Sequence, residues 1–212
     1  LGTMLGGYNV QALIPLLDSD LAEEASQALS STILVFDAFH DVVDKHKAGN
    51  VYATKLLQSW ANAEWFTNKK EIDHEIKLTV FKVDGETNTD DLSPAQNAWS
   101  RADIPLHAQA MLINKMPNGL NMIEDLKKLN NPLVYVGDVV GTGSSRKSAI
   151  NSLQWHMGNS IPFIPNKNTG GFVFGGKIAP IFFNTAEDSG AYPIECDVSQ
   201  MNNGDVITLK AH

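Results

Sequence analysis

The sequence predicts an antiparallel helical domain followed by an α/β domain with a compact mixed sheet. Three observations support this fold class. Apolar residues recur at intervals of three and four up to about residue 68. At about residue 70 the pattern changes to strand-like alternation, and short apolar runs separated by Gly, Pro and Asn then fill the rest of the chain. We therefore expect a helical domain over residues 1–70 and an α/β domain over residues 71–212.

Apolar side chains in the first domain follow a helical repeat, as in residues 13–21 and 33–43. Asp20 and Glu23 have the spacing of a capping box, and the pair Gly49-Asn50 is typical of one helix ending and the next beginning. We predict three or four antiparallel helices. Their lengths suit the stacked helix pairs of HEAT-like solenoids.

The second domain opens with a strand, because residues 76–83 alternate apolar and polar side chains. The polar segment 84–105 reads as a loop, and its length suggests that it is functional. A buried strand over residues 132–140 leads into a glycine-rich turn. Further predicted elements are helices around residues 107–113, 121–129 and 145–157, followed by short apolar runs that complete the mixed sheet.

Composition limits the function classes. The net charge of -8 and the pI near 5.1 argue against a broad electrostatic surface for nucleic acid or anionic lipid. The single cysteine, Cys196, excludes an internal disulfide and cannot by itself complete a zinc or iron–sulfur site. No run approaches the ~20 apolar residues of a membrane span, and no signal peptide is recognisable, so we expect a cytoplasmic protein. The chain begins with Leu1 in helical-looking sequence, which suggests a piece of a longer protein.

The stretch GDVVGTGSSRKSA, residues 137–149, combines three glycines with two serines and an arginine. A strand, a glycine turn and a helix N-terminus together present unpaired backbone N–H groups that bind a carboxylate or phosphate. Arg146 adds a planar fork for a carboxylate, and Ser144 or Ser145 could cap the helix or transfer a proton. A plain glycine turn with serine caps is the alternative. The spacing matches neither nucleotide-binding glycine motif, which disfavours nucleotide binding.

The polar segment 84–105 supplies further candidates. Asp90 and Asp91 could cap a turn or orient a substrate hydroxyl. Arg101, two residues after Trp99, could be a surface charge or a second carboxylate clamp.

Three motifs in order carry a resemblance to a known family. TDDLSPA, then WSR, then GTGSSRKSA resemble the swivel domain of the aconitases. GGKIAPIFFNTAEDSGAYPIE resembles the bacterial aconitase B branch in particular. In that branch a HEAT-like domain and the swivel domain precede the cluster-bearing domains. The resemblance therefore covers nearly the whole chain and implies a partial HEAT-like domain over residues 1–70 and a swivel domain over residues 71–212.

The resemblance also implies an activity, that of a hydro-lyase of the tricarboxylic acid cycle. Such an enzyme interconverts citrate and isocitrate through cis-aconitate. By resemblance, Ser144 would be the base that removes the carbon-bound proton, and Arg101 and Arg146 would hold substrate carboxylates. Ser145 would add hydrogen bonds, and Asp90 also falls on a position of the family's substrate site.

Family members hold a 4Fe–4S cluster through three cysteines, and Cys196 matches no such motif. The resemblance therefore implies that the cluster ligands lie outside this chain, that the chain holds no metal, and that it is inactive without the C-terminal cluster domains.

Two other interpretations remain open at this stage. One is the small subunit of an isopropylmalate dehydratase, which resembles a free-standing swivel domain. The other is a non-catalytic module, in which the helical domain forms a homodimer or the cluster-free form binds mRNA.

Overall fold

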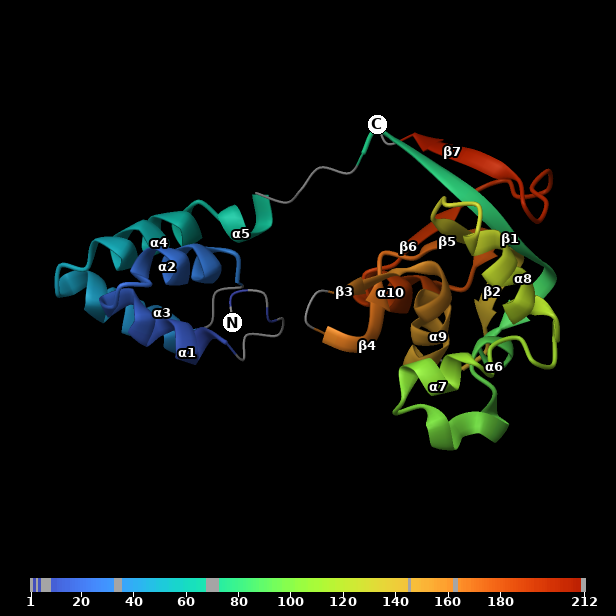
Figure 1. Cartoon of the computed structure of the whole chain (residues 1–212), viewed down its shortest axis with the longest axis horizontal. Coiled ribbons are helices and arrows are strands. Elements are labelled where there is room, and N and C mark those ends of the chain that lie inside the picture. The colour runs from blue at the N-terminus through green and yellow to red at the C-terminus, as the bar shows by residue number, and fades with distance from the viewer. Residues whose placement is uncertain are drawn as a thin grey trace. The chain divides into compact units, whose positions relative to one another are not determined.

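The computed structural model describes residues 2, 4, 9–32, 36–67, 73–144, 146–161 and 164–210. The chain divides into two compact units, Leu1–Ile72 and Asp73–His212 (Figure 1). Each unit has its own apolar core. Among the helices in the described ranges, none combines the length and the apolar character that crossing a membrane requires.

The first unit is helical. Leucine and alanine side chains on one face of each longer helix pack together, and Leu29, Ala38, Val42 and Leu56 are fully buried. Helix α4 contacts both α2 and α3. The elements are α1 (Val10–Leu13), the 3-10 helix η1 (Ile14–Asp18), α2 (Ala22–Ser30), α3 (Phe36–Lys47), α4 (Val51–Ala61) and α5 (Glu64–Thr67).

The two predicted helix signals of this unit had different outcomes. Gly49 has a positive φ of 90°, and the side chain of Asn50 accepts a hydrogen bond from the Ala53 N–H at 2.9 Å, so the predicted stop and start are confirmed. The capping box at Asp20 is wrong. Helix α2 begins at Ala22 with Leu21 at its N-cap, one residue too late for Asp20 to cap it. Ile33 of the predicted repeat lies outside the described residues.

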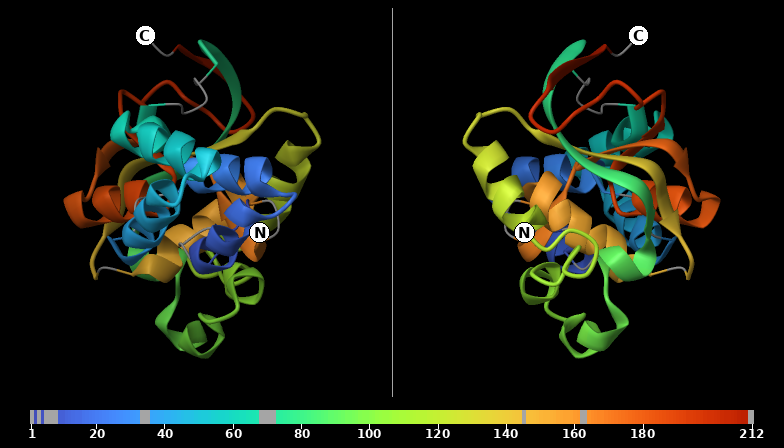
Figure 2. Two further views of the ribbon diagram at one scale, coloured as in Figure 1. Left: turned by 90° about the vertical axis from the view of Figure 1, so that its left-hand side faces the viewer. Right: turned by 90° about the vertical axis from the view of Figure 1, so that its right-hand side faces the viewer.

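The second unit is built on a five-stranded sheet with the order β6-β5-β2-β1-β7. Neighbouring strands run parallel, except that β7 is antiparallel to β1 at the edge, where Figure 2 shows the two strands side by side. Strands β3 and β4 pair antiparallel in a separate two-stranded sheet. The strands are β1 (Glu75–Asn88), β2 (Leu133–Thr142), β3 (Asn159–Ile161), β4 (Ile164–Thr169), β5 (Phe172–Ile178), β6 (Tyr192–Glu195) and β7 (Val206–Lys210). The mixed α/β class is therefore confirmed.

The predicted loop over residues 84–105 is mostly regular structure, which corrects the prediction. Strand β1 continues to Asn88 and is followed by α6 (Thr89–Leu92), the 3-10 helix η2 (Ala95–Ser100) and α7 (Ile104–Ala108). Local capping explains the difference, because Asn88 and Asp91 form a capping box and Asp103 caps α7. These one-turn helices are too short to show a 3.6-residue repeat in the sequence.

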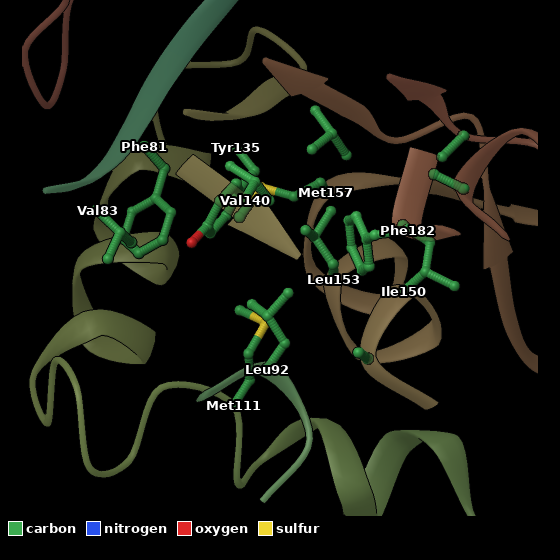
Figure 3. Packing of buried hydrophobic residues seen from close by; sticks show 14 of the residues in the cluster. Phe81, Val83, Leu92, Met111, Tyr135, Val140, Ile150, Leu153, Met157 and Phe182 are labelled. Atoms are coloured by element: carbon green, nitrogen blue, oxygen red, sulfur yellow. The ribbon is translucent and has the colours of Figure 1, made fainter. Parts of the chain in front are cut away.

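Three longer helices complete this unit, namely α8 (Gly119–Lys127), α9 (Lys147–Met157) and α10 (Pro180–Asp188). The predicted helix around residues 107–113 is displaced, since α7 ends at Ala108. Figure 3 shows the core between sheet and helices, where Phe81, Tyr135 and Leu153 belong to one buried cluster. The other face of the sheet has its own cluster around Val134 and Phe174. Because β2 is buried on both faces, its C-terminal end is held rigidly.

Candidate functional site

The site begins where β2 ends in the glycine turn. Gly141 and Gly143 have φ values of 78° and 91°, a region that side chains rarely adopt. A Cβ on Gly141 would also lie only 2.1 Å from the Cγ of Phe182 on α10. Both constraints explain why glycine stands here. The turn can therefore lie against α10 and present its backbone at the surface.

Helix α9 starts two residues later than predicted, at Lys147. Arg146 occupies its N-cap position, and no side chain caps the helix there. The interpretation of Ser144 as a helix cap is therefore wrong. Ser144 is exposed, and its backbone carbonyl accepts a hydrogen bond from the Thr89 hydroxyl at 2.8 Å. Ser145 lies outside the described residues.

Asp90 and Arg146 meet although 56 residues separate them. The Nη1 of Arg146 donates to Oδ1 of Asp90 and, at 2.9 Å, to the carbonyl of Ser93. The same Asp90 oxygen accepts from the Ala95 N–H at 3.0 Å. The hydrogen bond from Arg146 is the main cause that lowers the pKa of the Asp90 carboxyl, so this ion pair persists well below neutral pH.

Arg101 follows η2 and forms its C-cap. After the hydrogen bond from Arg146, the positive charge of Arg101 makes a small contribution to lowering the pKa of Asp90, and after burial it also lowers the pKa of His107. The Nε of Arg101 is buried and has no hydrogen-bond partner among the described residues. Trp99, two positions earlier, is 74% exposed. The segment therefore presents a large aromatic side chain and an incompletely paired cation.

A small cavity of about 110 Å³ adjoins the turn. Ser144, Arg146 and Thr89 line one side of it, and residues at the start of α10 line the other. The structure thus brings Ser144, Arg146 and Asp90 together, with the charge of Arg101 close by. Such a group of cations beside a hydroxyl can bind carboxylates and favour ionisation of the hydroxyl.

Sequence reasoning missed several polar residues next to this group, of which Ser93, Ser100 and His107 are buried and Ser148 is half-buried. Ser93, Ser100, His107 and Ser148 form a continuous hydrogen-bonded chain, whose distances lie between 2.7 and 2.9 Å. Ser93 stands within TDDLSPA and Ser148 follows the turn, but serines at such positions are common and carry no distinctive spacing. Only their contacts identify them.

The cluster that the family resemblance implies does not fit this chain. A 4Fe–4S cluster is held by several cysteine thiolates, and the sequence contains one cysteine. Cys196 is half-buried, and burial raises the pKa of its thiol. In the part of the chain that the structure describes, no three His, Cys, Asp or Glu side chains are grouped so as to hold a metal ion.

The solved structure of a 3-isopropylmalate dehydratase from Methanocaldococcus jannaschii aligns with 63% of this chain and 70% of its own. The identity is 22% and the TM-score 0.45, a score too low to establish a shared fold.

Comparison with known sequences gives a coherent result over the whole chain. Aconitate hydratase B from Synechocystis sp. is 64% identical over 99% of this chain, and the proteins of that name from Escherichia coli and Helicobacter pylori are 59% and 56% identical. The chain spans about a quarter of the length of these relatives. The family model described as Aconitate B N-terminal domain matches residues 1–66, and the model described as Aconitate hydratase 2 N-terminus matches residues 78–212. This chain therefore belongs to the aconitate hydratase 2 N-terminal family.

Proposed function

We propose that this chain is the N-terminal part of an aconitate hydratase, and that it supplies the carboxylate clamps and the base for interconverting citrate and isocitrate through cis-aconitate. The identity of 56–64% with proteins named aconitate hydratase B supports the activity of the full-length protein. The grouping of Ser144, Arg146 and Asp90 near Arg101 supports the roles within it.

The observation that carries the proposal is the incomplete pairing of two cations beside one exposed hydroxyl. Among the described residues, Arg146 bonds Asp90 and the Ser93 carbonyl through one nitrogen, Nη1, which leaves other guanidinium donors for a substrate carboxylate. Arg101 keeps a buried Nε without a partner among the described residues. A tricarboxylate satisfies both requirements, because each carboxylate accepts two parallel hydrogen bonds from a guanidinium.

In this proposal Ser144 acts on the substrate carbon. As an alkoxide, its Oγ takes the carbon-bound proton, and the electron pair left on carbon forms the double bond of cis-aconitate as the neighbouring hydroxyl departs. The cationic surroundings favour the ionised serine. The glycines at 141 and 143 let the turn approach the substrate closely, and Ser145 donates a further hydrogen bond.

A 4Fe–4S cluster is expected elsewhere in the full-length protein, since the residues of this chain do not fit it. The names HEAT-like for residues 1–70 and swivel for residues 71–212 belong to the same proposal, as does a cytoplasmic location. The isopropylmalate dehydratase alternative is not favoured, because relatives named aconitate hydratase B match the helical unit as well. Homodimer formation and mRNA binding gain no support from the described residues.

The test uses the full-length enzyme with Ser144→Ala. We expect kcat for isocitrate dehydration to fall by about 10²- to 10⁴-fold, the usual contribution of a positioned base. Ser160→Ala is the matched control, because Ser160 is an exposed serine on β3 of the same unit, and its turnover should match the wild type. Turnover of Ser144→Ala within threefold of the wild type would disprove the role of the base.

A further inference from the structure

Both ring nitrogens of the buried His107 are hydrogen-bonded. His107 is only 1% exposed and sits in α7, six residues after Arg101. Its Nε2 lies 2.7 Å from the Ser93 hydroxyl, and its Nδ1 lies 2.9 Å from the Ser100 hydroxyl. One imidazole thus joins the segment that carries Arg101 to the segment that carries Asp90.

The direction of each hydrogen bond in this chain follows from the donors available. Ser100 donates its only hydroxyl proton to the Asn97 carbonyl at 2.8 Å, so it accepts from Nδ1–H of His107. The neutral ring then accepts at Nε2 from the Ser93 hydroxyl, which in turn accepts from the Ser148 hydroxyl at 2.7 Å. Every donor in the chain has one acceptor, and the chain has a single consistent direction.

The two ends of this series of hydrogen bonds, Ser100 and Ser148, are next to groups of the proposed site. Ser100 directly precedes Arg101. Ser93 accepts from Nη1 of Arg146 through its carbonyl, and Ser148 lies in the first turn of α9, directly behind the turn that carries Ser144. The two arginines come from different elements, η2 and the start of α9, and the contacts of His107 connect those elements.

We propose that His107 is a positioning residue, which holds Arg101 in register with the Asp90–Arg146 pair through its bonds to Ser100 and Ser93. This inference rests on the proposed function. It assigns no contact between His107 and substrate, since the ring is buried. A clamp made of two guanidinium groups needs their separation fixed to within a fraction of an ångström, and the Arg101 segment consists of short 3-10 and one-turn helices with little rigidity of their own.

The protonation state of the ring agrees with this role. Burial lowers the pKa of His107, and the nearby charge of Arg101 lowers it further. The ring is therefore neutral near pH 7, as its acceptor role toward Ser93 requires.

Two substitutions separate the two bonds. A glutamine amide reaches the position of Nε2, so His107→Gln keeps a partner for Ser93 and loses the donor to Ser100. An asparagine amide reaches the position of Nδ1, so His107→Asn keeps the donor to Ser100 and loses Ser93. Because Ser100 adjoins Arg101, His107→Gln should raise the KM for isocitrate of the full-length enzyme about tenfold, and His107→Asn by less than half as much. Ser100→Ala should reproduce the effect of His107→Gln even where the ring substitution impairs folding.

The control is His156, a second buried histidine of the same unit, whose Nε2 donates at 2.9 Å to the carbonyl of Ala108, the residue after His107 in α7. His156 therefore contacts the same helix as His107 without a hydrogen bond to Ser93 or Ser100 among the described residues. His156→Asn should lower the melting temperature and leave KM within twofold of the wild type. Coupling gives the decisive readout. If His107 acts through Arg101, adding His107→Gln to Arg101→Lys should raise KM less than twofold further.

Failure of this inference is distinguishable from failure of the proposed function. Loss of activity in Ser144→Ala, together with an unchanged KM in both His107→Gln and Ser100→Ala, would overturn the positioning role alone. The positioning role would also be overturned if the KM increases of His107→Gln and Arg101→Lys multiply in the double variant. Multiplied increases would mean that His107→Gln acts independently of Arg101, as a general loss of stability does. A full-length wild-type protein that does not convert isocitrate would overturn both.

Discussion

The two units differ most in what their cores contain. In the described part of the first unit, the buried polar side chains are Asn9, Ser26 and Ser59. In the second unit they are Thr79, Thr87, Thr89, Ser93, Ser100, His107, Ser152, Gln154 and His156. Burying polar groups costs free energy unless each finds a partner. In the second unit Ser93, Ser100 and His107 bond to one another, and this network indicates where the chain uses stability for function.

The kind of contact also differs between the units. Helices α2 to α4 pack through apolar side chains such as Leu29, Val42 and Leu56, where packing tolerates volume-conserving exchanges. Around α6, α7 and α9 the contacts are directional, since hydroxyl, imidazole and guanidinium groups each bond specific atoms. We conclude that the helical unit depends mainly on apolar burial, whereas the α/β unit depends more on individual polar contacts.

The largest expected difference is between two glycines with similar backbone conformation. Gly141→Ala adds a Cβ in a left-handed residue and forces it into the ring of Phe182, so the second unit should lose about 3 kcal/mol or more of unfolding free energy. Gly49→Ala in the first unit has the same backbone cost but meets no atom within 4 Å, so the loss should be about 1 kcal/mol.

These two losses are measurable separately within one chain. Cys196 is the only cysteine, so thiol labelling during urea unfolding at constant pH reports the second unit. Hydrogen exchange of peptides from residues 9–67 reports the first. Equal losses for the two glycine variants would mean that contact with Phe182 does not determine the turn.

A smaller effect is expected where the helical unit does use a specific contact. Asn50 caps α4, and its Nδ2 donates to the Leu17 carbonyl at 2.7 Å. Asn50→Ala should therefore cost about 1–2 kcal/mol, from the lost cap and the unpaired carbonyl. The control Asn62→Ala removes an exposed side chain and should cost less than about 0.5 kcal/mol. Equal losses of unfolding free energy for the two variants in urea titrations would show that the Asn50 side-chain contacts do not stabilise this unit.

The smallest expected effect is a pH dependence of the second unit. Burial is the main cause that lowers the pKa of both His107 and His156 in the folded state. As pH falls below about 6.5, the unfolded chain binds protons that the folded chain does not, so unfolding free energy decreases until the folded pKa values are reached. Each histidine contributes at most about 1.4 kcal/mol per pH unit.

Urea titrations followed by circular dichroism at pH 7.5, 6.5 and 5.5 test this dependence. His107→Gln and His156→Asn should each flatten it. If the slope of unfolding free energy against pH is unchanged in both variants, groups other than these two histidines cause the pH dependence.

Much of the fold could be predicted from local pattern. The alternation of residues 76–83, the apolar run of 132–140 and the glycine–asparagine pair at 49–50 each act through neighbours in the chain, so the sequence shows them directly. The one-turn helices of residues 89–108 escaped prediction, because a capping box and a few backbone bonds leave no periodic signal. Local pattern made the glycine turn, Arg146, Asp90 and Arg101 candidates for an anion site, and the family resemblance assigned their roles.

The sequence by itself determined most of the longer helices, the strands that begin near residues 76 and 132, the placement of glycine in the turn, and a cysteine count too low for a cluster. Only the tertiary structure decided which polar residues meet. Parallel pairing of β1 with β2 puts Asn88 opposite Thr142, and so brings Asp90 to Arg146 and Ser93 to Ser148. Each of these pairs is 55 or 56 residues apart in the chain. The physical reason is that strand register is set by the sum of many apolar contacts across the sheet, which no short stretch of sequence contains.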